Sequence, residues 1–145
     1  MNSIYTRIRN YESVIAFLGC WPSFDDFEII SILLERIGYK GSVGPSLTIE
    51  FSAFCPDEAP NSSERRNCLL TLRFIEVENL KIEGFNHQNA INGFLISSQW
   101  SERLGRDVFS VKIVQGFGVG CTFDCAEIDV LSIKPAKSNN QSECA

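Results

Sequence analysis

The sequence has few of the residues and patterns that most enzymes and membrane proteins need. A single histidine occurs in 145 residues, and no two cysteines have the Cys-x-x-Cys spacing of a zinc or redox site. No run approaches the ~20 apolar residues of a membrane span, and the first residues lack the apolar stretch of a secretory signal. Phosphate-binding loops, zinc-protease helices and nucleophile elbows are also absent. These absences predict a cytoplasmic protein without catalytic residues, cofactor or metal.

The chain carries fewer positive than negative charges. Thirteen Lys and Arg against eighteen Asp and Glu give a net charge of −5. Binding of nucleic acid requires a positive surface, so the composition argues against a nucleic-acid partner. The acidic surface leaves room for a basic protein partner, and it would equally serve solubility alone.

Cysteine is present in an even number, which invites a disulfide framework. Such frameworks form in oxidising compartments, however, and a cytoplasmic protein keeps its thiols reduced. We therefore expect free, mostly buried thiols. The six residues are Cys20, Cys55, Cys68, Cys121, Cys125 and Cys144.

The length fits one domain, which we expect over residues 1–135, followed by a flexible tail at 136–145. Apolar positions at helical spacing predict one short helix over Asn10–Leu18, with the Asn10 side chain as N-cap and Gly19 at its end. Residues 27–37 fit two patterns, a helical stripe and a strand buried on both faces. Propensity does not separate these two interpretations.

Most of the remaining chain alternates apolar and polar residues, as half-buried β-strands do. The glycines of residues 116–120 indicate a strand-edge bend or close packing rather than a dinucleotide fingerprint. Seven or so antiparallel strands and one short helix predict a mainly β fold, either a β-sandwich or a strongly curved sheet. The expected strands are 46–54, 68–77, 80–82, 91–101, 108–115 and 122–134, with a β-bulge at Val130-Leu131 and an exposed loop at 55–67.

Two polar groups are the candidates for function. They are the carboxylates of Asp25, Asp26 and Glu28, and the polar side chains of Asn86, His87 and Gln88. Carboxylates and a histidine that met in one pocket would suit a small-ligand-binding or hydrolytic domain. Each group also has a structural interpretation, the first as capping or solubility residues and the second as a turn held by hydrogen bonds.

Two segments resemble the bacterial immunity protein 50 family. Residues 21–29, Trp-Pro-Ser-Phe-Asp-Asp-Phe-Glu-Ile, are similar to its N-terminal signature. Residues 72–89, which end in Gly-Phe-Asn-His-Gln-Asn, resemble its central signature, and residues 121–128 fit its last strand. The family pattern has a histidine where this chain has Asp25, which weakens any histidine-based reaction at this end.

The resemblance implies a cytoplasmic protein of a polymorphic toxin system that binds and blocks a cognate toxin. It favours the strand interpretation of residues 27–36, in a hairpin with residues 46–54. The expected partner-binding residues are Trp21, Phe24, Asp25, Asp26, Glu28, Asn86, His87 and Gln88. A toxin with a basic face, such as a nuclease-like domain, would suit this acidic chain. The acidic side chains expected to mimic phosphate are Asp25, Asp26, Glu50, Glu127 and Asp129.

Overall fold

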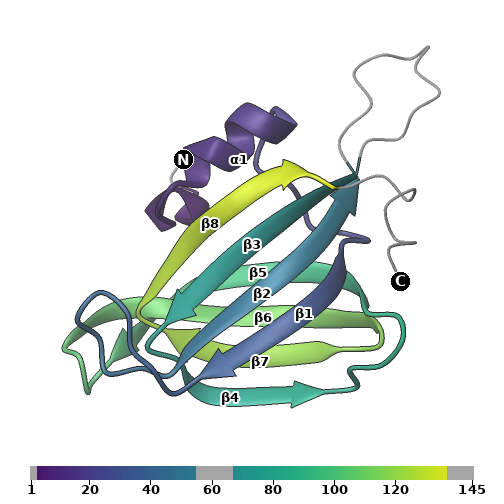
Figure 1. The fold of residues 1–145 in the computed structure, drawn as a ribbon. Helices are drawn as coiled ribbons and strands as arrows, with labels where there is room; N and C mark the ends of the chain where they lie inside the picture. The colour runs from purple at the N-terminus through teal and green to yellow at the C-terminus, as the bar shows by residue number, and fades with distance from the viewer. Residues whose placement is uncertain (1–2, 55–66, 137–145) are drawn as a thin grey trace, which may run out of the picture.

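A computed structural model describes residues 3–54 and 67–136. Within these residues, eight antiparallel strands form one open sheet in the order β4-β7-β6-β5-β1-β2-β3-β8. The sheet folds into two facing layers, β8-β3-β2-β1 and β5-β6-β7-β4 (Figure 1). The predicted mainly β, strongly curved sheet is therefore confirmed. The strands are β1 (Glu28–Glu35), β2 (Ser46–Phe54), β3 (Asn67–Ile75), β4 (Glu78–Glu83), β5 (Ala90–Ser101), β6 (Arg106–Phe117), β7 (Gly120–Cys125) and β8 (Glu127–Pro135).

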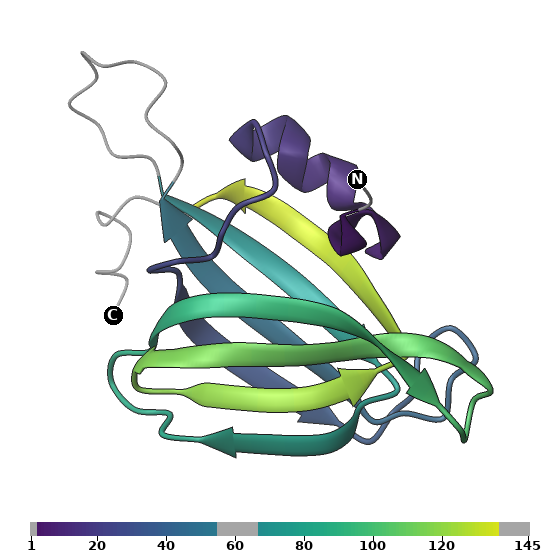
Figure 2. The same cartoon turned by 180° about the vertical axis from the view of Figure 1, so that it is seen from behind.

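The two layers are joined at a corner between β1 and β5. Glu28 opposite Ala90 is the one register pair that links these strands in the described chain. Beyond it, β1 continues in one layer and β5 in the other (Figures 1 and 2). On its other side β1 forms a long hairpin with β2, from Glu35 opposite Ser46 to Glu28 opposite Ser52. The strand interpretation of residues 27–36 is confirmed.

The core between the layers is built mainly from apolar strand positions and a chain of phenylalanines. Alternation along β2 and β3 turns every second residue inward, including Ile49 and Leu72, which are fully buried. Phe94 of β5 lies 4.6 Å from Phe24, ring centroid to ring centroid. Such tilted and edge-on aromatic pairs add to the free energy of burial.

The N-terminal segment covers the outer edge of β8. The 3-10 helix η1 (Ile4–Arg7) and the helix α1 (Tyr11–Leu18) lie beside this strand (Figure 2). The backbone N–H of Arg9 donates to the Ile128 carbonyl, and Val130 N–H donates to the Arg9 carbonyl, both at 2.9 Å. The predicted helix is confirmed, and it ends at Gly19 in the left-handed conformation.

Asn10 is not the side-chain cap that the sequence predicts. It adopts a left-handed φ of 67°, and its side chain makes no capping hydrogen bond. Instead, its Nδ2 donates to the Val130 carbonyl at 3.3 Å. The Asn10 side chain is therefore bonded to the edge of β8, and its Oδ1 accepts no N–H from the first turn of the helix.

The predicted single strand over residues 122–134 is wrong. The chain leaves β7 at Cys125, passes through Ala126 and enters β8 at Glu127, in the opposite layer. The Ala126 N–H donates to the Ile75 carbonyl at 2.8 Å, which holds the crossing point. The expected bulge is present at Leu131, because Thr71 pairs with Ser132 whereas Leu72 pairs with Val130.

The expectation that the cysteines are free, mostly buried thiols is confirmed in part. Cys121 and Cys125 are buried free thiols, whereas Cys20 is exposed. Cys68 is buried in the core. Cys55 and Cys144 lie outside the described residues, as do residues 55–66 of the predicted loop and 137–145 of the predicted tail. No helix in the described part of the chain is long and apolar enough to cross a membrane.

Candidate partner-binding site

The corner between β1 and β5 brings the two candidate groups together. Asp26 N–H donates to the Ile91 carbonyl and Ile29 N–H to the Asn89 carbonyl, both at 2.9 Å. The Asn89 N–H donates to Oε2 of Glu28 at 3.1 Å. A carboxylate of the first group is thus bonded directly to the backbone of the second group's loop. These hydrogen bonds join segments that lie about sixty residues apart in the chain.

Phe24 anchors the acidic turn. Its ring is 1% exposed and packs against Phe27, Phe51 and Phe94. Its φ is 68°, a left-handed value that bulky residues rarely adopt, and the backbone persists there because the core holds the ring. The structure therefore places Phe24 beneath the surface, where its ring cannot touch a protein partner. It positions the residues that follow it.

Asp25 and Asp26 lie at the exposed tip of this turn. Asp26 also has a left-handed φ, 65°, and its N–H is bonded to β5. The Asp25 N–H donates to Oγ of Ser23 at 3.3 Å. Hydrogen bonds hold the backbone of both residues, and both side chains are exposed to solvent.

Trp21 lies between the helical segment and the turn. Its ring is stacked on Tyr5 at 5.1 Å with an interplanar angle of 2°, and it is tilted against Phe24 at 5.7 Å. The side chain is half-buried, so part of the indole remains available to a partner. The indole can therefore pack against Tyr5 and Phe24 and still have a face open to a partner.

Asn89 organises the second group, although it is not among the residues that the sequence analysis selected. Its side chain is buried, with 3% of the residue exposed. Oδ1 accepts the N–H of Asn86 at 2.9 Å and the N–H of Val119 at 3.2 Å, while Nδ2 donates to the Asn86 carbonyl at 2.9 Å. Gln88 N–H donates to Oδ1 of Asn86 at 2.9 Å. The polar run is thus a turn held by hydrogen bonds, as one of the two interpretations predicted.

Gly118 allows this turn to approach the end of β6. Its φ is 95°, and a Cβ at this position would lie 2.1 Å from the Gln88 carbonyl oxygen. Only glycine fits such an approach without moving the backbone. The close-packing interpretation of the glycine-rich segment is confirmed at this residue.

The outer side chains of the turn face solvent. Asn86, His87 and Gln88 are all exposed. The imidazole of His87 lies 6.2 Å from the Phe117 ring in an edge-on arrangement. Within the described residues, no hydrogen bond or ion pair joins the imidazole to Asp25, Asp26 or Glu28.

Two further observations bear on catalysis. The described residues contain no group of three or more His, Cys, Asp or Glu side chains arranged to hold a metal ion. Burial raises the pKa of Cys121 to about 12, and burial together with the Asp124 carboxylate raises that of Cys125 well above its ordinary value. Both thiols stay protonated at neutral pH and are poor nucleophiles.

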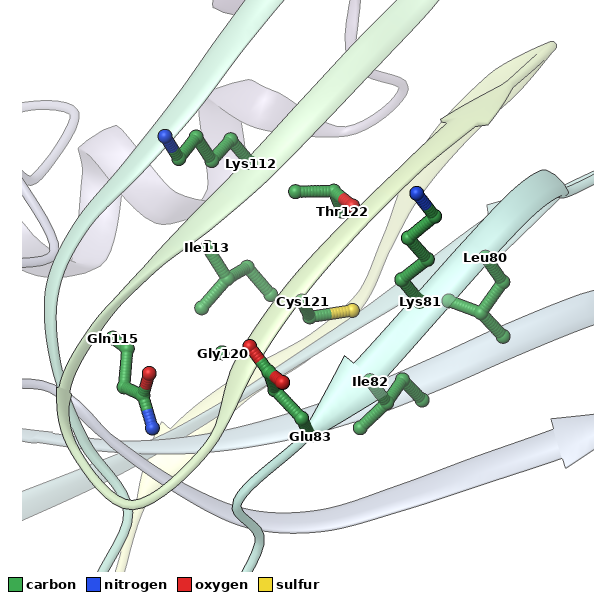
Figure 3. A pocket seen from close by; sticks show the side chains of 10 residues that line it. All are labelled: Leu80, Lys81, Ile82, Glu83, Lys112, Ile113, Gln115, Gly120, Cys121 and Thr122. Atoms are coloured by element: carbon green, nitrogen blue, oxygen red, sulfur yellow. The ribbon is translucent and has the colours of Figure 1, made fainter.

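A solvent-open hollow of about 600 Å³ lies on the β4-β7-β6 part of the sheet (Figure 3). Lys81, Thr122 and Lys112 form one row across the three strands. Glu83 is a further lining residue in the same view. None of the candidate residues lines this hollow. The sequence could not reveal it, because strand register alone brings the two lysines together.

The other acidic residues expected to contact a partner lie in different environments. Asp129 is 3% exposed and forms ion pairs with Lys40 and with Nε of Arg9, the latter at 3.4 Å. Its expected role as a surface charge is therefore wrong. Glu127 is half-buried, and its carboxylate lies 3.6 Å from Arg9. Glu50 is half-buried on β2.

Comparison with known proteins gives one match. A family model described as Immunity protein 50 matches residues 10–136, which is most of the chain. No curated protein and no solved structure matches. The matched range includes the helix α1, all eight strands and the whole β1–β5 corner.

Proposed function

Because the chain belongs to the immunity protein 50 family, we propose that it neutralises a cognate toxin by binding the toxin domain and blocking its action. The protein acts by occlusion rather than by catalysis. It serves a bacterial polymorphic toxin system and works in the cytoplasm of the cell that makes it. The family match over residues 10–136 is the observation that carries this proposal.

The toxin binds at the β1–β5 corner. The acidic turn of Asp25 and Asp26 and the turn of Asn86, His87 and Gln88 lie side by side there and expose their side chains. Glu28 connects them through Asn89, and Trp21 contributes its exposed edge. The backbone of both turns is held by hydrogen bonds, so little backbone conformational entropy is lost when a partner binds.

The toxin domain has a basic face, as a nuclease that must hold phosphates would have. The carboxylates of Asp25 and Asp26 are exposed and carry no ion pair among the described residues, so they are free to meet cationic side chains. The net charge of −5 would draw such a partner toward the protein from a distance. The competing explanation is that mild acidity serves solubility alone.

The test is binding to the toxin domain encoded by the adjacent gene, measured with the wild type and two variants. Asp25→Asn/Asp26→Asn removes both charges, and asparagine tolerates the left-handed backbone of residue 26. Glu102→Gln removes one exposed charge from the β5–β6 connection, at the far end of β5 from the corner. We expect the double variant to lower the association rate about tenfold at low salt, whereas the control changes it little.

High salt should bring the association rates of all three proteins together, because screening removes steering. Equal rates for the wild type and the double variant at every salt concentration would reject the acidic turn as the contact. Failure of the wild type to bind the toxin or to protect cells that express it would reject neutralisation itself.

A further inference from the structure

Two phenylalanine rings are exposed at the β1–β5 corner. Among the described Phe and Trp side chains, only Phe85, Phe117 and Trp100 are exposed by half or more, at 50%, 52% and 60%. Phe85 and Phe117 lie on either side of the polar turn, whereas Trp100 lies at the far end of β5. Single apolar residues on a surface are ordinary, but two large rings beside one turn form an apolar area of the kind that contacts another protein.

The backbone holds both rings in place. A Cβ at Gly84, the residue before Phe85, would lie 2.5 Å from the carbonyl oxygen of Gly118, the residue after Phe117. The two turns therefore pack directly on one another through their backbones. Asn89 ties them together further, because its Oδ1 accepts one backbone N–H from each turn. An aromatic side chain on such a fixed backbone loses only two torsions when a partner binds.

Phe117 shares a face of the sheet with Glu28. The register places Glu28 opposite Ala90 and Ala90 opposite Phe117, in one row across β1, β5 and β6. Residues in such a row point to the same side, and neighbours have Cβ atoms about 5 Å apart. Ala90 contributes only a methyl group between the other two. The exposed ring is thus continuous with the acidic part of the corner.

The corner carries charge of one sign. The three segments that build it contain carboxylates but no lysine or arginine, and no ion pair within the described residues neutralises these carboxylates. The segments are residues 21–29, 83–92 and 115–120, and the carboxylates are those of Asp25, Asp26, Glu28 and Glu83. A partner with cations is therefore favoured here, whereas a second copy of the chain would bring like charges together.

The exposed aliphatic residues of β1 do not select a partner in this way. Leu33, Leu34 and Ile37 are 54%, 51% and 61% exposed, toward the end of β1 that lies away from the corner. Charges of both signs lie beside them in the chain, because Glu35 is followed directly by Arg36. Neither a cationic nor an anionic partner is preferred at that end.

We propose that Phe85 and Phe117 are the apolar anchors of the toxin interface, and that they receive a toxin surface in which an apolar side chain is flanked by lysine or arginine. This inference rests on the proposed neutralisation and specifies its contact. The carboxylates of the corner act during approach, because unlike charges attract over a distance. The rings act after contact, because their apolar area leaves water only when the two surfaces meet. Steering therefore depends on the carboxylates, and retention of the toxin depends on the rings.

Binding kinetics with the toxin domain encoded by the adjacent gene separate these two roles. We expect Phe85→Ala and Phe117→Ala each to raise the dissociation rate about tenfold or more, and to leave the association rate within about twofold at every salt concentration. Asp25→Asn/Asp26→Asn should instead change mainly the association rate. The matched control is Trp100→Ala, which removes a comparably exposed ring at the far end of β5 and should change neither rate.

A conservative variant and a measurement on the wild type complete the design. Phe117→Leu keeps most of the apolar area, so its dissociation rate should stay within about threefold of the wild type. Hydrogen exchange of the wild type, with and without the toxin domain, detects the contact without any substitution. We expect the amides of residues 85–88 and 117–119 to exchange more slowly in the complex.

Dissociation rates that both alanine variants leave unchanged, while the wild type binds the toxin, would overturn this inference alone. No binding by the wild type would overturn it together with the proposed neutralisation. A larger effect for Trp100→Ala would place the apolar contact at the far end of β5 and overturn it as well. Sedimentation of the free chain tests the remaining occupant, since a dimer that Phe117→Ala dissociates would assign the two rings to a second copy and overturn the proposal.

Discussion

The carboxylate of Glu28 accepts the backbone N–H of Asn89 at 3.1 Å. This bond joins the first residue of β1 to the turn that precedes β5, at the corner where the two layers of the sheet separate. It fixes the acidic turn and the polar turn relative to one another. The proposed binding surface therefore depends on a few hydrogen bonds made by residues that lie beneath it.

Asn89→Ala should destabilise the protein by about 2–4 kcal/mol, because it leaves the N–H groups of Asn86 and Val119 without their acceptor in a buried place. Urea unfolding followed by circular dichroism measures this loss. Gln88→Ala is the matched control in the same turn, since the Gln88 side chain is exposed. It should change stability by less than about 0.5 kcal/mol. Equal effects for the two variants would contradict the role given to Asn89.

Gly118→Ala and Gly105→Ala compare two glycines that both have positive φ, 95° and 64°. A Cβ at Gly105 meets no atom within 4 Å, whereas one at Gly118 meets the Gln88 carbonyl at 2.1 Å. Gly105→Ala should therefore cost only the backbone strain, about 1 kcal/mol. Gly118→Ala should cost at least about 1–2 kcal/mol more, because the turn must move. Thermal unfolding of the two variants would decide this, and similar midpoints would contradict the close approach.

Most of the strands could be predicted because one of their faces is buried, which leaves apolar and polar residues alternating along the sequence. Alternation failed at Ala126, where the chain crosses between layers with no glycine or proline to mark the break. It was also ambiguous for β1, whose Leu33 and Leu34 are exposed on an open edge, unlike a strand buried on both faces. The resemblance to a family, and not the pattern, resolved that segment.

The candidate site could be predicted only in part. Asp25, Asp26 and His87 stood out by their residue type, and the structure exposes them. Asn89 is a polar residue like its neighbours Asn86, His87 and Gln88. Its importance comes from its tertiary contacts with Glu28 and Val119. Sequence patterns carry little information about such contacts, because they depend on which strands become neighbours.

Asp129→Asn should destabilise the protein by about 1–3 kcal/mol. This buried carboxylate pairs with Lys40 of the loop between β1 and β2 and with Arg9 of the N-terminal segment, so its loss leaves both cations without their main partner. The measurement is chemical denaturation at neutral pH. Glu127→Gln is the control, because that carboxylate is 38% exposed and lies 3.6 Å from Arg9. An exposed pair of this kind contributes less than about 1 kcal/mol. A larger loss of stability for Glu127→Gln than for Asp129→Asn would contradict the role given to Asp129 as the buried partner of both cations.

Stability should decline at alkaline pH because of Cys121. Burial raises the pKa of this thiol from 9.0 to about 12, so the folded state holds its proton more tightly than the unfolded state does. The stabilisation is complete below about pH 9, where the thiol is protonated in both states, and it is lost as the pH rises from 9 toward 12. Urea unfolding at a series of pH values would show this decline, and Cys121→Ala should make it shallower. A decline of the same steepness in Cys121→Ala would assign the effect to other groups.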